Sequence, residues 1–260
     1  MPFVETKRLR MHYEVDGPEH APTLVLSNSL GTNLSLWEPQ LPTFTKSFRV
    51  LRYDTRGHGQ TEVTQGEYSI EQLGRDVVGL LDALKLDRVN FCGLSIGGMT
   101  GMWLGVNAPQ RLKKLVLCNT APQIGKLDTW NERIEKVREG GMKSVADQVV
   151  ERWFTPEYRA KEPSMVEKTK EMITSTSSEG YAGACAAVRD FSFWDKVGAI
   201  QSLTLVIAGT HDQSVPPADA QKLAQSIKGA RYVELKAAHI SNIEAADKFT
   251  AEVASFLVNS

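Results

Sequence analysis

Short apolar runs alternate with longer amphipathic segments along most of this chain, and that alternation constrains the fold more than any other feature. The apolar runs have the length of strands and occupy residues 23–27, 49–53, 88–92, 112–118, 203–208 and 231–235. Apolar residues recur at helical spacing in residues 69–84, 96–107, 217–226 and 243–257. Strands that alternate with helices favour a mostly parallel sheet, and nearly continuous apolar strands indicate that helices cover both faces. We therefore predict a doubly wound α/β fold.

Residues 122–194 interrupt the alternation. They contain several amphipathic helix candidates, rich in charged and aromatic residues, and no convincing strand. The strand–helix pattern resumes after them, and a chain of 260 residues has room for one large domain. We expect an α/β core formed by residues 1–121 and 195–260, with residues 122–194 inserted as a helical cap.

Composition excludes several classes of partner. Lys and Arg total 30 against 31 Asp and Glu, so the net charge of −1 gives no electrostatic reason to bind nucleic acid or an anionic membrane. No run approaches the roughly 18 apolar residues of a membrane span, and three cysteines do not form a disulfide framework. We expect a cytoplasmic protein. No cluster of residues has metal-ligand spacing and no glycine-rich loop fits a phosphate, so the sequence predicts no metal and no cofactor.

A candidate nucleophile lies in the segment Gly93-Leu94-Ser95-Ile96-Gly97. The G-x-S-x-G pattern arises by chance in about one chain in ten of this composition, so its context decides its meaning. Here it follows an apolar strand and opens a helix, as a nucleophile elbow requires. The turn is strained, and its glycines avoid clashes that larger side chains would make. We expect this turn to raise the Ser95 hydroxyl above the sheet.

A serine at its ordinary pKa needs a general base. Of five histidines, His239 follows the last strand and comes after Ser95 in the chain. Functional groups in doubly wound sheets collect at the carboxyl ends of strands, and the elbow fold orders its residues Ser, acid, His. Asp212 follows the strand at residues 203–208 and fits the acid. The competing position, after residues 112–118, carries Asn119. We predict a triad of Ser95, Asp212 and His239.

The oxyanion hole should combine two backbone N–H groups. One belongs to Ile96, directly after the nucleophile. The other should come from the loop after residues 23–27, where we choose Leu30. The polar turn at residues 54–61 has a catalytic composition, but we interpret it as a tight structural turn locked by Asp54 and Arg56.

By these features the chain resembles the α/β-hydrolase superfamily over nearly its whole length, and within it the 3-oxoadipate enol-lactonases of bacterial aromatic degradation. The resembling stretches are residues 26–32, 52–59, 92–98 and 152–156. Many superfamily members have His-Gly in the oxyanion loop, whereas this chain has Asn28-Ser29, which is similar to the enol-lactonase variant.

The resemblance implies that the chain hydrolyses a small carboxylated lactone, 3-oxoadipate enol-lactone, to 3-oxoadipate without a cofactor in the cytoplasm. The cap should then supply a partner for the substrate carboxylate. Arg133, at helical spacing from Trp130, is our candidate for that contact, and Trp153 is a candidate to pack on the ring. Three alternatives stay open: a general carboxylesterase, a carbon–carbon bond hydrolase, and a receptor-like member that binds a ligand without turnover. The oligomeric state is left open.

Overall fold

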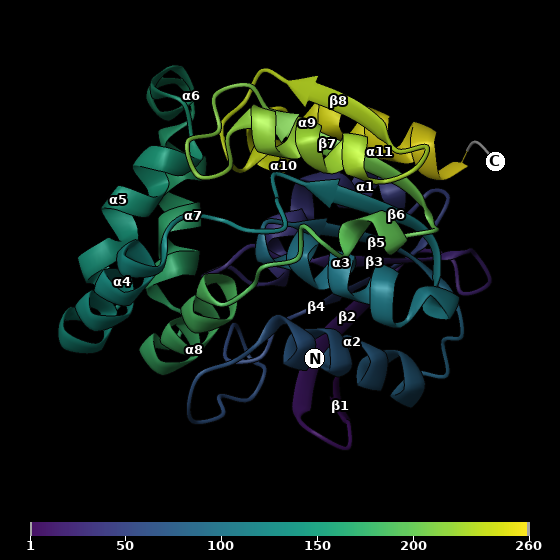
Figure 1. Cartoon of the computed structure of the whole chain (residues 1–260), viewed down its shortest axis with the longest axis horizontal. Coiled ribbons are helices and arrows are strands. Elements are labelled where there is room, and N and C mark those ends of the chain that lie inside the picture. The colour runs from purple at the N-terminus through teal and green to yellow at the C-terminus, as the bar shows by residue number, and fades with distance from the viewer. Residues whose placement is uncertain (1, 259–260) are drawn as a thin grey trace.

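A computed structural model describes residues 2–258 of the chain. Within them, eight strands form one sheet in the order β1-β2-β4-β3-β5-β6-β7-β8 (Figure 1). The strands are β1 (Phe3–Glu5), β2 (Arg10–Asp16), β3 (Thr23–Ser27), β4 (Arg49–Tyr53), β5 (Val89–Leu94), β6 (Leu112–Cys118), β7 (Leu203–Gly209) and β8 (Arg231–Leu235). β2 is antiparallel to β1 and β4, and every other pairing is parallel. The predicted mostly parallel sheet is confirmed.

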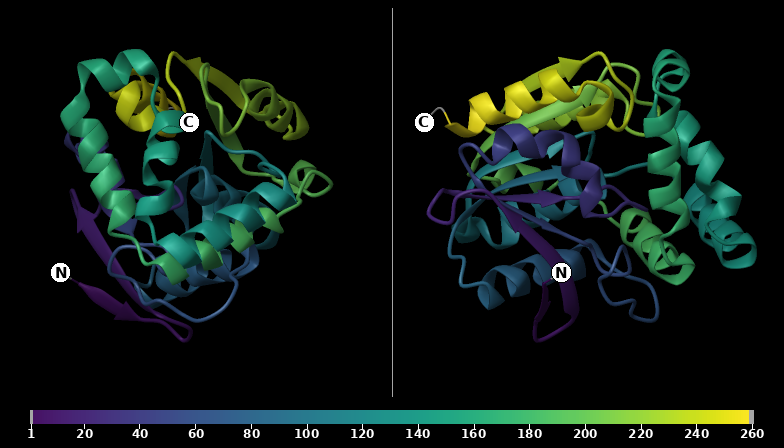
Figure 2. Two further views of the ribbon diagram at one scale, coloured as in Figure 1. Left: turned by 90° about the vertical axis from the view of Figure 1, so that its left-hand side faces the viewer. Right: turned by 180° about the vertical axis from the view of Figure 1, so that it is seen from behind.

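Helices cover both faces of this sheet. They are α1 (Leu41–Phe44), α2 (Ile70–Ala83), α3 (Ile96–Asn107), α4 (Leu127–Gly140), α5 (Lys143–Trp153), α6 (Pro156–Lys161), α7 (Pro163–Thr174), α8 (Ser178–Arg189), α9 (Pro217–Ser226), α10 (Ser241–Glu244) and α11 (Ala246–Val258), with 3-10 helices η1 (Leu34–Gln40), η2 (Pro109–Arg111) and η3 (Val197–Ala199). α3 packs on β5 and β6, α9 packs on β7 and β8, and α2 packs on α3. Seen from behind, α1 and α11 lie over the opposite face (Figure 2).

The sequence predicted most of these elements closely because buried strands and amphipathic helices carry strong local signals. Helix α2 begins where expected, since the Ser69 side chain accepts a hydrogen bond from the Gln72 N–H as an N-cap. The final helix differs from the prediction. Instead of one helix over residues 243–257, the chain forms α10 and α11, separated by a break at Ala245.

The polar turn after β4 is largely buried, and Asp54 and Arg56 lock it in place, as predicted. The Asp54 carboxylate accepts hydrogen bonds from the Leu34 N–H at 2.8 Å and the Gln60 N–H at 2.9 Å, and contacts His12 Nδ1 at 2.7 Å. The Arg56 guanidinium donates two hydrogen bonds, of 2.6 and 2.7 Å, to the buried Asp76 carboxylate. Burial raises the pKa of Asp76, and the paired guanidinium opposes that shift. These contacts pin the turn against η1 and α2.

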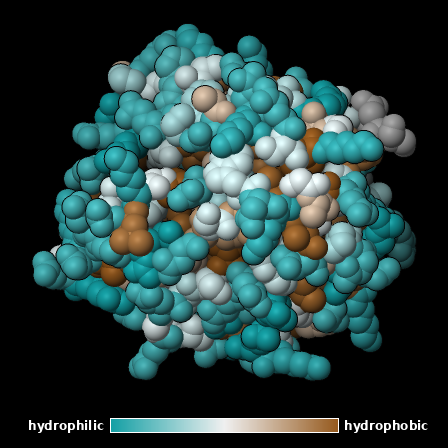
Figure 3. Space-filling view, in the orientation of Figure 1, coloured by the Kyte–Doolittle hydropathy of each residue, from teal (hydrophilic) through white to brown (hydrophobic). Residues whose placement is uncertain are grey.

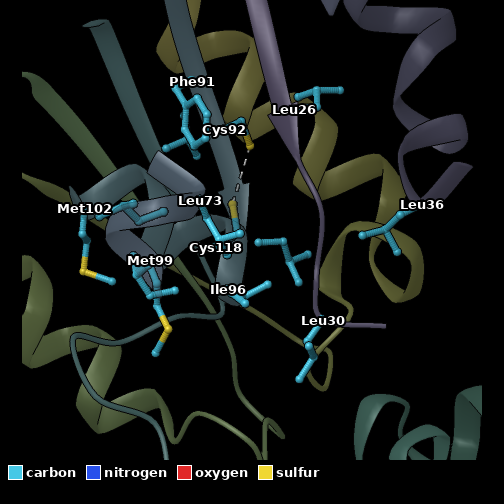
Figure 4. Packing of buried hydrophobic residues seen from close by; sticks show 14 of the residues in the cluster. Leu26, Leu30, Leu36, Leu73, Phe91, Cys92, Ile96, Met99, Met102 and Cys118 are labelled. Carbon is cyan, nitrogen blue, oxygen red and sulfur yellow. Dashed lines mark hydrogen bonds between the residues drawn. The ribbon is translucent and has the colours of Figure 1, made fainter. Parts of the chain in front are cut away.

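The core continues up to the carboxyl edge of the central strands. Leu26, Phe91 and the two cysteines Cys92 and Cys118 are fully buried there. Their sulfur atoms lie 3.8 Å apart without a disulfide, as Figure 4 shows, so both act as small apolar side chains. The face of the molecule drawn in Figure 3 is mainly hydrophilic with scattered apolar residues. None of the described helices is long and apolar enough to cross a membrane.

Helices α4–α8 all lie between β6 and β7 and gather at one side of the sheet (Figure 1). They contact the loops at the carboxyl ends of the strands. The Thr176 hydroxyl donates to the Gly31 carbonyl at 3.0 Å, and the Ile240 N–H donates to the Trp153 carbonyl at 3.2 Å. We propose that residues 122–194 form a cap on a core of residues 1–121 and 195–260.

Two glycines on α2 test how tightly this helix packs. A Cβ atom added to Gly74 would lie 2.1 Å from the Trp103 ring, whereas one added to Gly79 would meet nothing closer than Thr6 at 3.5 Å. We expect Gly74→Ala to destabilise the protein by about 1–3 kcal/mol through overpacking. Gly79→Ala should stabilise it by about 0.5–1 kcal/mol, because alanine favours a helix interior. Urea unfolding of both variants measures the difference, and equal effects would contradict this packing.

Candidate active site

Ser95 occupies a strained turn between β5 and α3. Its backbone has φ 57° and ψ −116°, in a region that side-chain-bearing residues rarely adopt. A Cβ atom on Gly97 would lie 2.4 Å from the Ser27 carbonyl oxygen, and one on Gly93 would lie 2.2 Å from the Gly97 carbonyl oxygen. The Ser95 N–H donates to the Cys118 carbonyl at 2.9 Å. Glycine at both positions therefore lets the helix approach the sheet closely enough to hold the turn.

His239 and Asp212 form a buried pair at the neighbouring strand ends. His239 Nδ1 lies 2.8 Å from Asp212 Oδ2, and both side chains are at most 3% exposed. The other carboxylate oxygen accepts the N–H groups of Ser214 and Val215 at 2.8 and 2.9 Å. Because an ionised carboxylate only accepts hydrogen bonds, Nδ1 carries the proton and Nε2 is left to accept one. This is the tautomer that a general base requires.

Asn119 completes the surroundings of the acid, and its part was missed in the sequence. Its amide nitrogen donates to Asp212 Oδ2 at 3.0 Å and to the Ala238 carbonyl at 3.2 Å. Its amide oxygen accepts from the Ser241 hydroxyl at 2.6 Å. The position after β6, which competes with Asp212 for the role of the acid in the sequence, holds an amide that hydrogen-bonds to the Asp212 carboxylate instead. The Asn119 amide therefore links the Asp212 carboxylate to the loop that carries His239.

Hydrogen bonds through Glu244 also connect the loop that carries His239 to Thr155, between α5 and α6. Glu244 accepts a hydrogen bond from the Ala238 N–H at 2.8 Å, and the same carboxylate accepts from the Thr155 hydroxyl. Ala238, which precedes His239, is therefore held by Glu244 of α10 and by Asn119. Ile240, which follows His239, is held by the Trp153 carbonyl.

Ser95 and His239 line the same cavity, of about 150 Å³. The predicted residues Leu30, Trp130, Arg133 and Trp153 line it too, whereas Asp212 lies behind the imidazole. The remaining wall comes from residues that the sequence did not single out for the site, namely Ser29, Ile124, Gly125, Thr129, Arg152, Tyr181, Val188, Gln213 and Ser214. The structure thus brings the predicted nucleophile, base and cap residues to one hollow.

Of the two predicted oxyanion donors, Leu30 lines this cavity, and Ile96 directly follows Ser95, which also lines it. Ile96 is the first residue of α3, so its N–H has no partner within the helix and sits at the positive end of the helix dipole. Leu30 follows β3 and precedes Gly31, whose φ is 78°. Figure 4 shows Leu30 and Ile96 toward the same end of the central strands. This arrangement can stabilise a negative oxygen near Ser95.

Arg133 and Arg152 give the cavity a positive wall. The Arg133 guanidinium carbon lies 4.9 Å from the centre of the Trp130 ring, and the Trp153 ring lies 5.9 Å from the His239 ring. In the part of the chain that the structure describes, no ion pair joins either arginine to a carboxylate. Among the same residues, no group of three or more His, Cys, Asp or Glu could hold a metal ion.

A strained serine at a strand-to-helix turn, in one cavity with a histidine that a buried acid orients, defines an α/β hydrolase. The comparison with protein families agrees, because the α/β hydrolase fold family matches residues 22–246, and the chain belongs to that family. It is 40% identical to 3-oxoadipate enol-lactonase 2 of Acinetobacter baylyi, over 94% of this chain and 91% of that protein. It is 36% identical to 3-oxoadipate enol-lactonase 1 of the same organism, with the same coverage.

A solved structure has nearly the same fold. The crystal structure of the enol-lactonase from Burkholderia xenovorans LB400 superposes with a TM-score of 0.98 at 48% sequence identity. The match covers 99% of this chain and all of that one. The likeness therefore extends through the helical segment as well as the sheet.

The role of the acid can be tested without changing the shape of the site. Asp212→Asn keeps the side-chain volume but favours the wrong tautomer of His239, so we expect kcat to fall by about 10⁴-fold. Steady-state kinetics measures the loss, and unchanged thermal unfolding would show that the fold is intact. A loss smaller than tenfold would remove Asp212 from this role.

Proposed function

We propose that this protein is a serine hydrolase that opens 3-oxoadipate enol-lactone to 3-oxoadipate through an acyl-enzyme. The observation that carries the proposal is the shared cavity, which the elbow serine and the oriented histidine line together with two arginines that have no carboxylate partner. The 40% and 36% sequence identity to two 3-oxoadipate enol-lactonases supports 3-oxoadipate enol-lactone as the substrate. The reaction is a carboxylic ester hydrolysis, and we place it in the cytoplasm, in the degradation of aromatic compounds.

Acylation follows from the positions of the polar groups. The Ser95 hydroxyl attacks the lactone carbonyl carbon while His239 Nε2 takes its proton, and Asp212 stabilises the imidazolium that forms. The N–H groups of Leu30 and Ile96 donate to the oxygen that becomes negative. The carbon–oxygen bond of the ring then breaks, the ring oxygen leaves as an enolate, and the imidazolium gives its proton to that enolate, so that His239 is neutral again. An enolate is a better leaving group than an alkoxide, so this step needs less protonation by His239.

Deacylation reverses the proton transfers. A water molecule gives a proton to His239 as its oxygen attacks the acyl carbon, and Ser95 leaves with the proton that the imidazolium returns. The water oxygen ends in the new carboxylate. The enol part of the product converts to a ketone, which discourages closure of the ring. Apart from the substrate and this water molecule, the chemistry uses only groups that the chain itself provides.

Arg133 is the proposed partner of the substrate carboxylate. Its planar guanidinium can form two parallel hydrogen bonds to a carboxylate, and it lies over the Trp130 ring, which restricts its orientation. Arg152 adds a second positive charge to the same wall. Trp153, packed beside His239, is proposed to contact the lactone ring.

A continuous ultraviolet assay of enol-lactone loss tests this function directly. We expect turnover by the wild-type protein and none by Ser95→Ala, whose fold should be unchanged. A panel of esters with and without a free carboxylate separates the alternatives. Equal rates across the panel would favour a general carboxylesterase, cleavage of carbon–carbon ring-fission products would favour that class of hydrolase, and a burst of acyl-enzyme with negligible turnover would favour a receptor-like protein.

The proposed contact between Arg133 and the substrate carboxylate can be tested against a control arginine on the same helix. Arg133→Gln should raise KM for the enol-lactone by about 10–100-fold, the size of a lost hydrogen bond to a charged group, and leave a neutral aryl ester almost unaffected. Arg138→Gln removes an exposed arginine of α4 that does not line the cavity and should change neither substrate. An unchanged KM in Arg133→Gln would show that the contact is absent.

A further inference from the structure

Ser29 lies beside the nucleophile at the carboxyl edge of the sheet. Strand β3 pairs with β5 in parallel, with Ser27 opposite Gly93. Ser29 and Ser95 each stand two residues beyond that pair, so the register brings both to the same edge. Both residues line the cavity that contains His239.

The Ser29 hydroxyl has no hydrogen-bond partner, although the residue is only 2% exposed. The other buried polar side-chain atoms without a partner among residues 2–258 belong to Arg52, His58, Arg159 and Asn242, none of which lines this cavity. An unpaired buried hydroxyl costs folding free energy and requires an explanation. Because Ser29 lines the catalytic cavity, rotation of its side chain would bring this hydroxyl to a ligand bound there.

The hydroxyl is not needed to shape its own loop. Asn28, the preceding residue, donates to the Tyr53 carbonyl at 2.8 Å and accepts from the Trp37 indole N–H at 2.9 Å. The Ser29 backbone carbonyl accepts the Thr32 hydroxyl at 2.7 Å. Side chains other than that of Ser29 therefore hold the loop in place.

We propose that the Ser29 hydroxyl donates a hydrogen bond to the substrate carbonyl oxygen as that oxygen becomes negative. It would act as a third donor beside the N–H groups of Leu30 and Ile96. Rotation about one side-chain bond is enough to aim a serine hydroxyl, and a donor to a developing charge strengthens in the transition state. The inference rests on the proposed function as an ester hydrolase, and concerns a step that every ester substrate shares.

The test compares two serines of the same segment. For Ser29→Ala we expect kcat to fall about 10- to 100-fold on both the enol-lactone and 4-nitrophenyl acetate, with little change in KM. Its Tm should rise by about 2–4 °C, because an unpaired buried hydroxyl is removed. Ser27→Ala is the control for stability. The Ser27 hydroxyl lies 2.7 Å from the Tyr53 hydroxyl, so its removal breaks a buried hydrogen bond and should lower Tm.

An unchanged kcat in Ser29→Ala would overturn the proposal. So would a fall in kcat accompanied by a fall in Tm like that of Ser27→Ala, because it would show a structural role. Affinity for an arylboronic acid, which forms a tetrahedral adduct on a serine hydroxyl, gives a second readout and should weaken by the same factor. If the wild-type protein hydrolyses 4-nitrophenyl acetate but not the enol-lactone, the substrate assignment fails while the Ser29 comparison is still decided on the aryl ester.

Discussion

The approach of helix α3 to the end of β3 is the contact on which the site depends. The Gly97 backbone lies so close to the Ser27 carbonyl that a single added carbon would overlap it. That approach holds Ser95 at φ 57° and directs the first N–H groups of α3 to the edge of the sheet. Several hydrogen bonds around the turn hold its strained backbone in place, which is how such strain persists in a folded protein. This backbone contact thus positions Ser95, the proposed nucleophile, and the Ile96 N–H, one of the two proposed oxyanion donors, at the edge of the sheet.

The acid and the base are fixed by a network that joins distant parts of the chain. Asn119 after β6 links Asp212 after β7 to the backbone beside His239. Glu244 then connects that same loop to Thr155 between α5 and α6. Asn119, Asp212 and His239 are buried, and buried polar groups are stabilising only when each has its partners. The helical segment therefore contributes to the position of the base as well as to the walls of the cavity.

Sequence reasoning predicted the elements whose local signals are strong and missed those set by tertiary contacts. The buried parallel strands and the elbow glycines follow from composition and spacing, and the residue order of the elbow fold leads from Ser95 to Asp212 and His239. Asn119 and Glu244 carry no such signal, because an amide in a loop or a carboxylate at the end of a short helix is usually a surface group. The same holds for Arg152, which only the packing of α4 and α5 places in the cavity. Whether the Ser29 hydroxyl has a hydrogen-bond partner depends on all of its neighbours in the fold, so it cannot be derived from the sequence of its own loop.

The central claim is that Ser95 and His239 act as nucleophile and base in one cavity. Treatment with an aryl phosphonate, followed by mass spectrometry of the peptides, tests it most directly. We predict one equivalent of label on Ser95 in the wild-type protein and labelling at least about 100-fold slower in His239→Ala, the scale of general-base catalysis. Label on another residue, or equal rates in the two proteins, would contradict it.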